Sequence, residues 1–441
     1  EAIGAVGIGV LSPCITLLDA ALQPTVPAIL YNDQRSLDQI AAARRDLPLA
    51  DYERRIGNVL TPGTCAVSSI AWLRDNRPDA YRNARCIAWT NTFMSARLTG
   101  HPATDPSMAA LSGLAAIDDC THWSPELCAA MGIDSRLLPP IMGAADRVGL
   151  ISPEAARQTG IRPGVTVACG CGDIPAATLG AGVVDQRTMV YSAGSTDCVS
   201  VPLVAPLTQR SWVNCGYLDR HRWLGVGTAT SSGISVEWFC REWLPDLKRP
   251  AAYEAMTQLA AASPPGANGL LYLPYLQGER TPVWDPLARG AFVGLAAATR
   301  REDMARAVFE GTAFALRHIL TSLGPDHHLA DYQIRAVGGC TRNPLWNQIK
   351  TDVLQRPLDI LRDCETGILG AALLGAIATG LYPSAQEAAK AARATQAATR
   401  IEPDRNLARC YNRRFDLFKD LYPVLAPAMH ELASQEPYCP S

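Results

Sequence analysis

The feature that most constrains this chain is a pair of short β-rich runs in its middle third, each ending in small residues. Residues 165–169 form a β-rich run that is too short for a helix, and closely spaced glycines follow, where backbone or a ligand can come near. Asp173 stands at this exit, and a small-residue segment with helical spacing follows at 176–184. A second predicted strand at 188–192 ends in the turn Ala-Gly-Ser-Thr at 193–196. One strand end therefore carries a carboxylate, and the other carries glycine and hydroxyl groups.

These two strand ends suit a phosphoryl-transfer site, where catalysis is mostly positioning and charge stabilisation. A carboxylate such as Asp173 can accept the proton of an attacking hydroxyl. Turns of glycine and hydroxyl residues can bind phosphate through backbone N–H groups. A second interpretation stays open on the residues alone: Asp173 caps a helix, and Gly194 and Ser195 form an ordinary turn.

Composition limits the classes of partner. A chain of 441 residues with 48% hydrophobic and 19% charged residues can build two or three domains with a substantial core. A net charge of −2 gives no electrostatic case for nucleic acid. The sequence has no polybasic tract to hold a membrane surface, and its longest apolar run, 368–381, is too short to span a bilayer. We therefore expect neither a nucleic-acid nor a membrane partner.

The fourteen cysteines are scattered without the spacing of a disulfide scaffold or a metal site. Cys169 and Cys171 are separated by one residue, unlike a Cys-x-x-Cys pair. The N-terminus has no charged region before an apolar core, as a signal peptide would. These features predict free thiols in a reducing cytoplasm and no protein-only metal site.

Four motifs in the second half of the chain carry a resemblance to a known family. Residues 273–282 read Leu-Pro-Tyr-Leu-Gln-Gly-Glu-Arg-Thr-Pro, 285–295 read Asp-Pro-Leu-Ala-Arg-Gly-Ala-Phe-Val-Gly-Leu, 307–311 read Ala-Val-Phe-Glu-Gly, and 337–346 read Val-Gly-Gly-Cys-Thr-Arg-Asn-Pro-Leu-Trp. This order resembles the FGGY carbohydrate kinases, and within them the xylulose kinases. The resemblance extends from Ile3 to about Pro383.

The resemblance implies an α/β fold of two actin-like (ribonuclease H-like) ATPase domains with a cleft between them. It implies a sugar-binding domain at 1–184 and a nucleotide-binding domain at 185–441. It also implies that ATP and Mg²⁺ are used to phosphorylate a sugar or polyol hydroxyl. Members of the family are often dimers, although no interface signal stands out in this sequence.

The resemblance assigns roles to individual residues. Asp173 becomes the counterpart of the catalytic base. The residues that correspond to nucleotide-binding positions are the second phosphate loop, a glycine at a helix start, and two adenosine-binding positions: Gly194, Ser195, Thr196, Gly233, Gly339 and Asn343. Glu279 and Arg280 are expected to form a structural ion pair or a wall of the cleft.

The start of the chain departs from the family. Residues 3–10 predict one buried strand. In the family, a hairpin with Asp-x-Gly-Thr precedes this point; it forms the first phosphate loop, and its Asp helps to hold Mg²⁺. Nothing in the sequence matches this hairpin, so the ATP site is expected to be incomplete as the chain is written.

The expected sugar site also departs from the family. Ser12 follows Leu11 where xylulose kinases carry Met-His, which contacts the sugar. Ser12 is therefore a candidate sugar contact, and the alternative is a different substrate or no direct contact. Ile174 stands where Asn or Gln often contacts the sugar. Asn32 and Asp33 match a segment that contacts the sugar in the family. Their amide and carboxylate groups can also hydrogen-bond to sugar hydroxyls. The alternative is that Asn32 or Asp33 caps the following helix, and for Asp105 a capping role is favoured over the pocket.

Together these observations predict an ATP-dependent kinase with Asp173 as base, acting on a ketopentose such as D-xylulose. Glycerol or another polyol is the alternative substrate class. A sugar- or nucleotide-binding relative without catalysis and an actin-like chaperone or filament protein are the alternatives from other classes.

Overall fold

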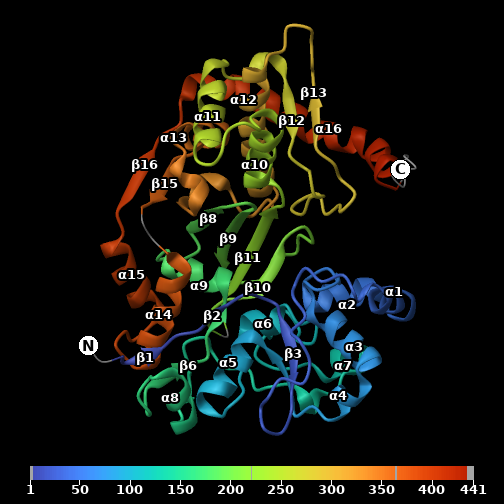
Figure 1. Ribbon diagram of the computed structural model, residues 1–441, viewed down its shortest axis with the longest axis vertical. Helices are drawn as coiled ribbons and strands as arrows, with labels where there is room; N and C mark the ends of the chain where they lie inside the picture. The colour runs from blue at the N-terminus through green and yellow to red at the C-terminus, as the bar shows by residue number, and fades with distance from the viewer. Residues whose placement is uncertain (1–2, 220, 363–364, 435–441) are drawn as a thin grey trace. The chain divides into compact units, whose positions relative to one another are not determined.

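The computed structural model describes residues 3–219, 221–362 and 365–434, and its contacts divide the chain into two compact units (Figure 1). Unit 1 contains residues 1–186, 200–226 and 363–396; unit 2 contains residues 187–199, 227–362 and 397–441. The units interleave along the sequence, and the predicted domains 1–184 and 185–441 stay a prediction.

Unit 1 begins with two very short strands, β1 (Ala5–Val6) and β2 (Gly9–Val10). The single strand predicted at residues 3–10 is therefore wrong. β1 lies at the edge of a three-stranded sheet in the order β1-β6-β5, with β6 at Thr166–Ala168 and β5 at Arg147–Leu150. β2 pairs in parallel with β7 (Cys171–Gly172) instead. Gly7 lies between the two strands, where a Cβ would be only 1.7 Å from the carbonyl oxygen of Ala371.

A second part of unit 1 surrounds the antiparallel pair β3 (Ile15–Leu18) and β4 (Cys86–Trp89). Both strands are buried along their whole length, as expected for apolar strands covered by helices on both sides. The helices of this part are α1 (Leu37–Asp46), α2 (Leu49–Ile56), α3 (Ala66–Asn76), α4 (Pro78–Arg82), α5 (Thr90–Thr99), α6 (Pro106–Ala110) and α7 (Pro125–Ala130).

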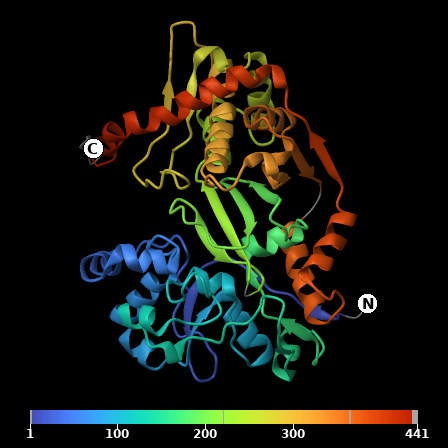
Figure 2. The same cartoon turned by 180° about the vertical axis from the view of Figure 1, so that it is seen from behind.

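Helix α9 (Asp173–Gly180) packs on α14 (Thr366–Ala378), which comes from the third segment of unit 1 (Figure 2). Their backbones touch: a Cβ on Gly180 would lie 1.8 Å from the oxygen of Thr366, and one on Gly370 would lie 1.7 Å from the oxygen of Ala176. Only glycine permits such an approach. The remaining elements of unit 1 are α8 (Pro153–Thr159), β10 (Val213–Gly216) and α15 (Ala385–Thr395).

Unit 2 contains a mainly parallel sheet of β8 (Thr188–Ala193), β14 (Gln333–Val337), β15 (Leu358–Leu361) and β16 (Ala398–Ile401). β14 pairs in parallel with both β8 and β15, and β16 is antiparallel to β15. Strand β9 (Asp197–Leu203) starts in unit 2, and β11 (Trp223–Ala229) ends there.

The buried helix α12 (Arg301–Thr321) forms the centre of the helical part of unit 2. It packs against α10 (Ser232–Trp243), α11 (Ala251–Ala262), α13 (Pro344–Leu354), α16 (Ala408–Ser434) and the hairpin strand β12 (Leu271–Leu273), which pairs with β13 (Ala291–Val293). No helix in the described part of the chain is long and apolar enough to cross a membrane. The twelve cysteines described are free thiols.

Candidate active site

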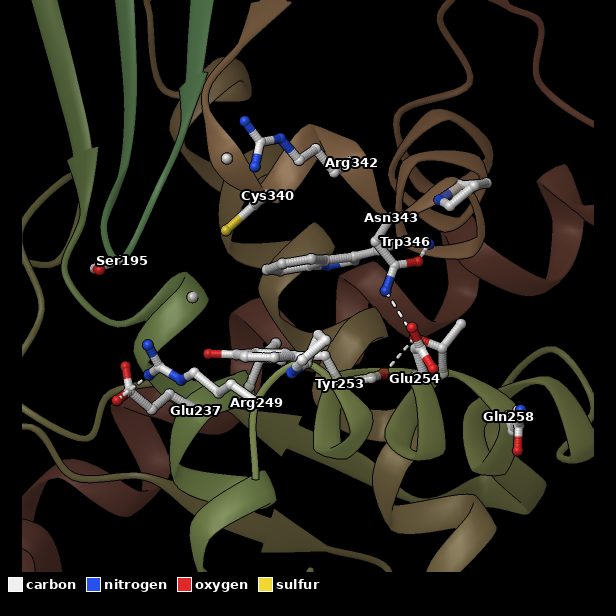
Figure 3. A pocket seen from close by; sticks show the side chains of 16 residues that line it. Ser195, Glu237, Arg249, Tyr253, Glu254, Gln258, Cys340, Arg342, Asn343 and Trp346 are labelled. Atoms are coloured by element: carbon white, nitrogen blue, oxygen red, sulfur yellow. Dashed lines mark hydrogen bonds and ion pairs between the residues drawn. The ribbon is translucent and has the colours of Figure 1, made fainter. Parts of the chain in front are cut away.

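A pocket of about 760 Å³ lies entirely within unit 2 (Figure 3). Four of the six predicted nucleotide-binding residues line it together: Ser195, Gly233, Gly339 and Asn343. Gly194 and Thr196 flank Ser195 in the same turn, after strand β8, and are not among the lining residues. The structure therefore brings the sequence-predicted loops to one cavity of a size suited to a small-molecule ligand.

The turn at 194–196 is held by the first turn of α10. The N–H of Gly233 donates to the oxygen of Gly194 (3.2 Å), and the N–H of Ile234 donates to the oxygen of Ser195 (3.1 Å). A Cβ on Gly233 would lie 2.4 Å from the oxygen of Gly194, so glycine is required at this contact. Because its amide is engaged with the turn, Gly233 acts here by holding the turn.

The loop after β14 is joined to the same turn. The Cys340 thiol donates to the oxygen of Gly194 (3.3 Å). Asn343 caps α13 by accepting from the N–H of Trp346 (3.0 Å), and Pro344 occupies the first helical turn, as the sequence predicted. The amide nitrogen of Asn343 donates to the hydroxyl of Thr257 (2.8 Å), which ties α13 to α11.

The wall contributed by α11 was missed from the sequence. Its members that line the pocket are Tyr253, Glu254, Thr257 and Gln258. Figure 3 shows the ring of Tyr253 and the indole of Trp346 nearly parallel, on opposite sides of the pocket. Aromatic faces of this kind stack well on a planar heterocycle. The sequence between 251 and 262 reads only as a helix rich in alanine, so it gave no signal of this role.

Arg249 lies beside Tyr253 at the pocket. It pairs with Glu237, and its guanidinium carbon is 5.3 Å from the ring centroid of Tyr253. This cation packs against the aromatic wall and adds a positive group to a cavity whose other lining charges are Glu237, Glu254 and Arg342.

Buried charges lie behind the pocket. Asp197 is completely buried, and its Oδ2 accepts from the hydroxyls of Tyr191 and Ser232, each at 2.8 Å. Lys350 is also completely buried, with Nζ 3.7 Å from the ring centroid of Trp346. Burial raises the pKa of Asp197 and lowers that of Lys350, and the attraction between the two charges opposes both shifts. Asp197 thus holds Ser232 at the start of α10, and Lys350 packs on the indole of Trp346.

The carboxylate of Glu279 has other partners than the side chain of Arg280. Its Oε1 accepts from the N–H and hydroxyl of Thr230 (2.8 and 3.1 Å) and from the backbone N–H of Arg280 (2.7 Å). Within the described residues, Glu279 forms no ion pair with Arg280, so the ion-pair alternative is wrong, and the alternative of a cleft wall stays a prediction. Burial raises the pKa of Glu279 to about 7. The carboxyl group supports the loop before α10 from inside the protein.

The second group of predicted site residues lies in unit 1, where the parallel strands β2 and β7 end side by side. Ser12 follows β2, and Asp173 follows β7 as the first residue of α9; Gly172, and not Asp173, occupies the cap position. The Oδ1 of Asp173 accepts from the N–H of Ile174 (2.9 Å), and the neighbouring Ser12 side chain acts to lower the pKa of the Asp173 carboxyl. A Cβ on Gly172 would lie 2.6 Å from the Ser12 Oγ, so the two strand ends fit only with glycine there.

Asp173 is exposed in a hollow of about 510 Å³. The surrounding protein displaces enough water to raise the pKa of its carboxyl, against the opposing effects of the Ile174 N–H and the Ser12 side chain. Solvent access to the carboxylate limits this rise. The other residues that line the hollow are apolar or glycine: Ile3, Ala5, Val6, Gly7, Gly9, Ile161, Ala176, Gly367, Ile368, Ala371 and Ala372.

Asn32 and Asp33 do not line this hollow. The carboxylate of Asp33 accepts from the N–H and Nε of Arg35 (2.9 and 2.8 Å), and this pairing lowers its pKa. Helix α1 begins after Ser36, so neither Asn32 nor Asp33 caps it. Asp105, in contrast, caps α6 by accepting from the N–H of Ser107 (2.9 Å), in agreement with the favoured prediction.

The α/β fold holds a ligand-sized pocket beside a glycine-hydroxyl turn and, separately, a carboxylate at the end of a parallel strand, which are groups that phosphoryl transfer uses. Residues 1–180 match the N-terminal domain of the FGGY family of carbohydrate kinases, and residues 189–379 match its C-terminal domain. The chain belongs to the FGGY family of carbohydrate kinases and is a sugar kinase.

Similar proteins include two kinds of sugar kinase. The xylulose kinase of Bacillus subtilis (strain 168) is 27% identical over 412 residues, which cover 92% of this chain and 80% of the relative. The gluconokinase of the same organism is 26% identical over 377 residues, covering 84% of this chain and 73% of the relative. The sequence likeness therefore confirms the predicted family and enzyme class without separating these two substrates.

Solved structures agree with the fold. The xylulose kinase of Rhodospirillum rubrum has a TM-score of 0.87 and 26% identity, covering 97% of this chain and 85% of that chain. The xylulose kinase of Lactobacillus acidophilus has a TM-score of 0.90 at 23% identity, covering 98% and 86%. The glycerol kinase of Plasmodium falciparum, solved with ADP, has a TM-score of 0.83 at 21% identity, covering 94% and 83%. The predicted actin-like α/β fold is confirmed.

Proposed function

We propose that this sugar kinase transfers the γ-phosphate of ATP to a hydroxyl of a ketopentose such as D-xylulose, with Asp173 as the general base. The observation that carries the proposal is the position of Asp173, exposed at the end of β7 beside Ser12. A carboxylate with a raised pKa that remains accessible can take the proton of a hydroxyl as it attacks. The xylulose kinases among the relatives support this substrate class.

The pocket of unit 2 fits the nucleotide. Its aromatic faces, Tyr253 and Trp346, suit a planar base, and the neighbouring turn carries the hydroxyl of Ser195 for phosphate oxygens. Gly339 leaves open space, since no atom lies within 4 Å of a Cβ built there. These contacts support the proposed roles of Ser195, Gly339 and Asn343 in binding ATP.

Mg²⁺ would neutralise charge on the phosphates during transfer. Among the residues described, no three His, Cys, Asp or Glu side chains form a group that could hold a metal ion. Mg²⁺ commonly keeps several waters and binds through substrate phosphates together with one or two carboxylates. We therefore propose that the ion binds mainly through ATP. We also propose a cytoplasmic enzyme that acts on small molecules, as a monomer or homodimer.

The chemistry beside Asp173 favours a neutral sugar. The described residues that line the hollow are apolar or glycine apart from Asp173, and none of them is Lys or Arg. A sugar acid such as gluconate carries a carboxylate that needs a cation or several N–H donors, because burying an unpaired charge is costly. This observation supports xylulose over gluconate, and Ser12 and Asp173 offer polar contacts for a sugar hydroxyl.

The test is a coupled ADP-release assay on the full chain with D-xylulose, ribulose, gluconate and glycerol. We expect turnover with a ketopentose, with kcat/KM at least about 10-fold above that for gluconate, since one well-made or missing polar contact changes specificity by this order or more. Preferential turnover of gluconate would contradict the substrate proposal. ATP binding without turnover of any sugar would favour the non-catalytic alternative.

Replacing Tyr253 by alanine should weaken ATP binding by about 2- to 12-fold, because an aromatic stacking contact contributes about 0.5–1.5 kcal/mol. Tyr253→Phe keeps the ring and serves as the matched control. Isothermal titration with a non-hydrolysable ATP analogue measures both variants. An alanine variant with the affinity of the phenylalanine variant would contradict a stacking role for Tyr253.

A further inference from the structure

The end of strand β7 is held in place by a helix that lies outside its own sheet. The N–H of Gly172, the residue before Asp173, donates to the Oγ of Ser107 in α6 (3.2 Å). Ser107 is completely buried and is followed in α6 by three further buried residues. This bond joins α6 to the backbone immediately before the proposed base.

Ser107 is itself held by a buried polar network. Asp105 is completely buried, and its Oδ2 accepts from the N–H of Ser107 (2.9 Å). The amide of Asn91 donates to Oδ1 of Asp105 (3.1 Å), and its oxygen accepts from the N–H of Thr92 (2.9 Å). Asp105, itself held from α5, therefore fixes the backbone from which the Ser107 side chain extends.

Helix capping alone does not account for this arrangement. A cap needs only the bond from Asp105 to the N–H of Ser107, and an exposed carboxylate or a serine would supply it without loss of hydration. Here the carboxyl group is fully buried, and burial raises its pKa to about 6. The network forms one bond beyond the cap: the Oγ of Ser107 accepts from the N–H of Gly172, the last residue of β7, which directly precedes Asp173.

We infer that Ser107, oriented by Asp105, is a positioning residue for the Asp173 base and acts through the backbone N–H of Gly172. The space around Gly172 makes this coupling direct. A Cβ on Gly172 would lie 2.6 Å from the Oγ of Ser12 and 3.5 Å from the Cδ of Pro175, so the backbone there is confined between the Ser12 turn and α9. A displacement of Gly172 moves Asp173 and its partner Ser12 together.

The inference rests on the proposed function, because it concerns the placement of the base relative to a sugar hydroxyl. A reacting group displaced by about 1 Å can lose roughly 100-fold in rate without any loss of substrate binding. Loss of the Ser107 hydroxyl also leaves a buried N–H without its partner, so the strand end is expected to shift. Nucleotide binding by unit 2 needs none of these residues, since its pocket contains residues of unit 2 alone.

The test compares Ser107→Ala with Ser112→Ala in the full chain. Ser112 is also completely buried, follows the same helix and accepts from the backbone N–H of Leu114 (2.8 Å); among the described residues its hydroxyl forms no hydrogen bond to β7. We expect Ser107→Ala to lower kcat for the sugar by about 10- to 100-fold. Its KM and its affinity for an ATP analogue should stay within about 3-fold of the parent, and Ser112→Ala should keep kcat within the same limit.

Two further variants complete the test. Ser107→Thr retains the hydroxyl and should recover most of the lost kcat. If Ser107→Ala does not fold, Asp105→Asn takes its place, because an asparagine oxygen can still accept from the N–H of Ser107 while the charge is lost. Equal kcat in Ser107→Ala and Ser112→Ala would overturn the inference and leave the proposed function standing. A parent enzyme that binds ATP but phosphorylates no sugar would overturn both.

Discussion

Replacing Asp173 by asparagine is expected to lower kcat for sugar phosphorylation by about 10²- to 10⁴-fold, the usual contribution of a general base. Asparagine has the same shape and keeps an oxygen to accept from the N–H of Ile174, so α9 should begin as before. It cannot accept the proton of the attacking hydroxyl. Because the pocket of unit 2 contains no part of Asp173, affinity for an ATP analogue should stay within about 3-fold.

A matched comparison separates this effect from a general loss of charge. Asp118 is an exposed carboxylate of the same unit and does not line the hollow of Asp173. Asp118→Asn should retain parent kcat and KM. Steady-state kinetics and isothermal titration of both variants provide the measurement. Turnover by Asp173→Asn at the level of Asp118→Asn would exclude Asp173 as the base.

Replacing Gly233 by alanine is expected to weaken ATP binding by about 5- to 150-fold. The new Cβ would lie 2.4 Å from the oxygen of Gly194 and 3.0 Å from the Cα of Ser195, both of them backbone atoms. The turn at 194–196 must therefore move away from α10, and overpacking of this kind costs about 1–3 kcal/mol. At an exposed helix position, replacing glycine by alanine stabilises the helix by about 1 kcal/mol. A loss of stability or ATP affinity in Gly233→Ala would therefore be due to the contact with the turn at 194–196.

Two other glycines provide the comparison for Gly233. Gly339→Ala meets no protein atom within 4 Å and should fold normally, so a loss of ATP affinity in it reports contact with the nucleotide itself. Gly4→Ala also meets no atom within 4 Å and lies outside the pocket, so it should change nothing. Titration with an ATP analogue and thermal unfolding measure all three. Parent affinity in Gly233→Ala would contradict the role of this contact in shaping the turn.

The elements that the sequence predicted well depend on local rules. The strand at 188–192 appears as Thr188–Ala193, and Asn343 with Pro344 starts α13, because a cap and a fixed proline φ act on their own helix. Residues 3–10 were misread as one strand, since their apolar pattern does not show that Gly7 must pass close to α14. The spacing of apolar residues indicates which positions are buried. It does not indicate which distant segment of the backbone covers them.

The site shows the same division. Asp173 and the turn at 194–196 were predictable because each follows a strand and carries its chemistry in adjacent residues. Tyr253 was not, because its role depends on α11 facing Trp346 across the pocket, which no spacing encodes. For Glu279 the sequence left an ion pair with Arg280 or a wall of the cleft open, and the side chain instead accepts from the backbone N–H of Thr230. Burial overrides proximity along the chain when a carboxylate finds several N–H donors.

The backbone contact between α9 and α14 also has a consequence for biosynthesis. Helix α9 starts at Asp173, whereas Gly370 and the rest of α14 leave the ribosome only after the first two segments of unit 2 have been made. Until then the small-residue face of α9 has no covering helix, so the nascent chain exposes it while the intervening segments fold. Unit 1, which contains Asp173, can therefore fold completely only after α14 has been translated. If translation stops before residue 366, the polypeptide contains Asp173 but lacks the helix that supports α9.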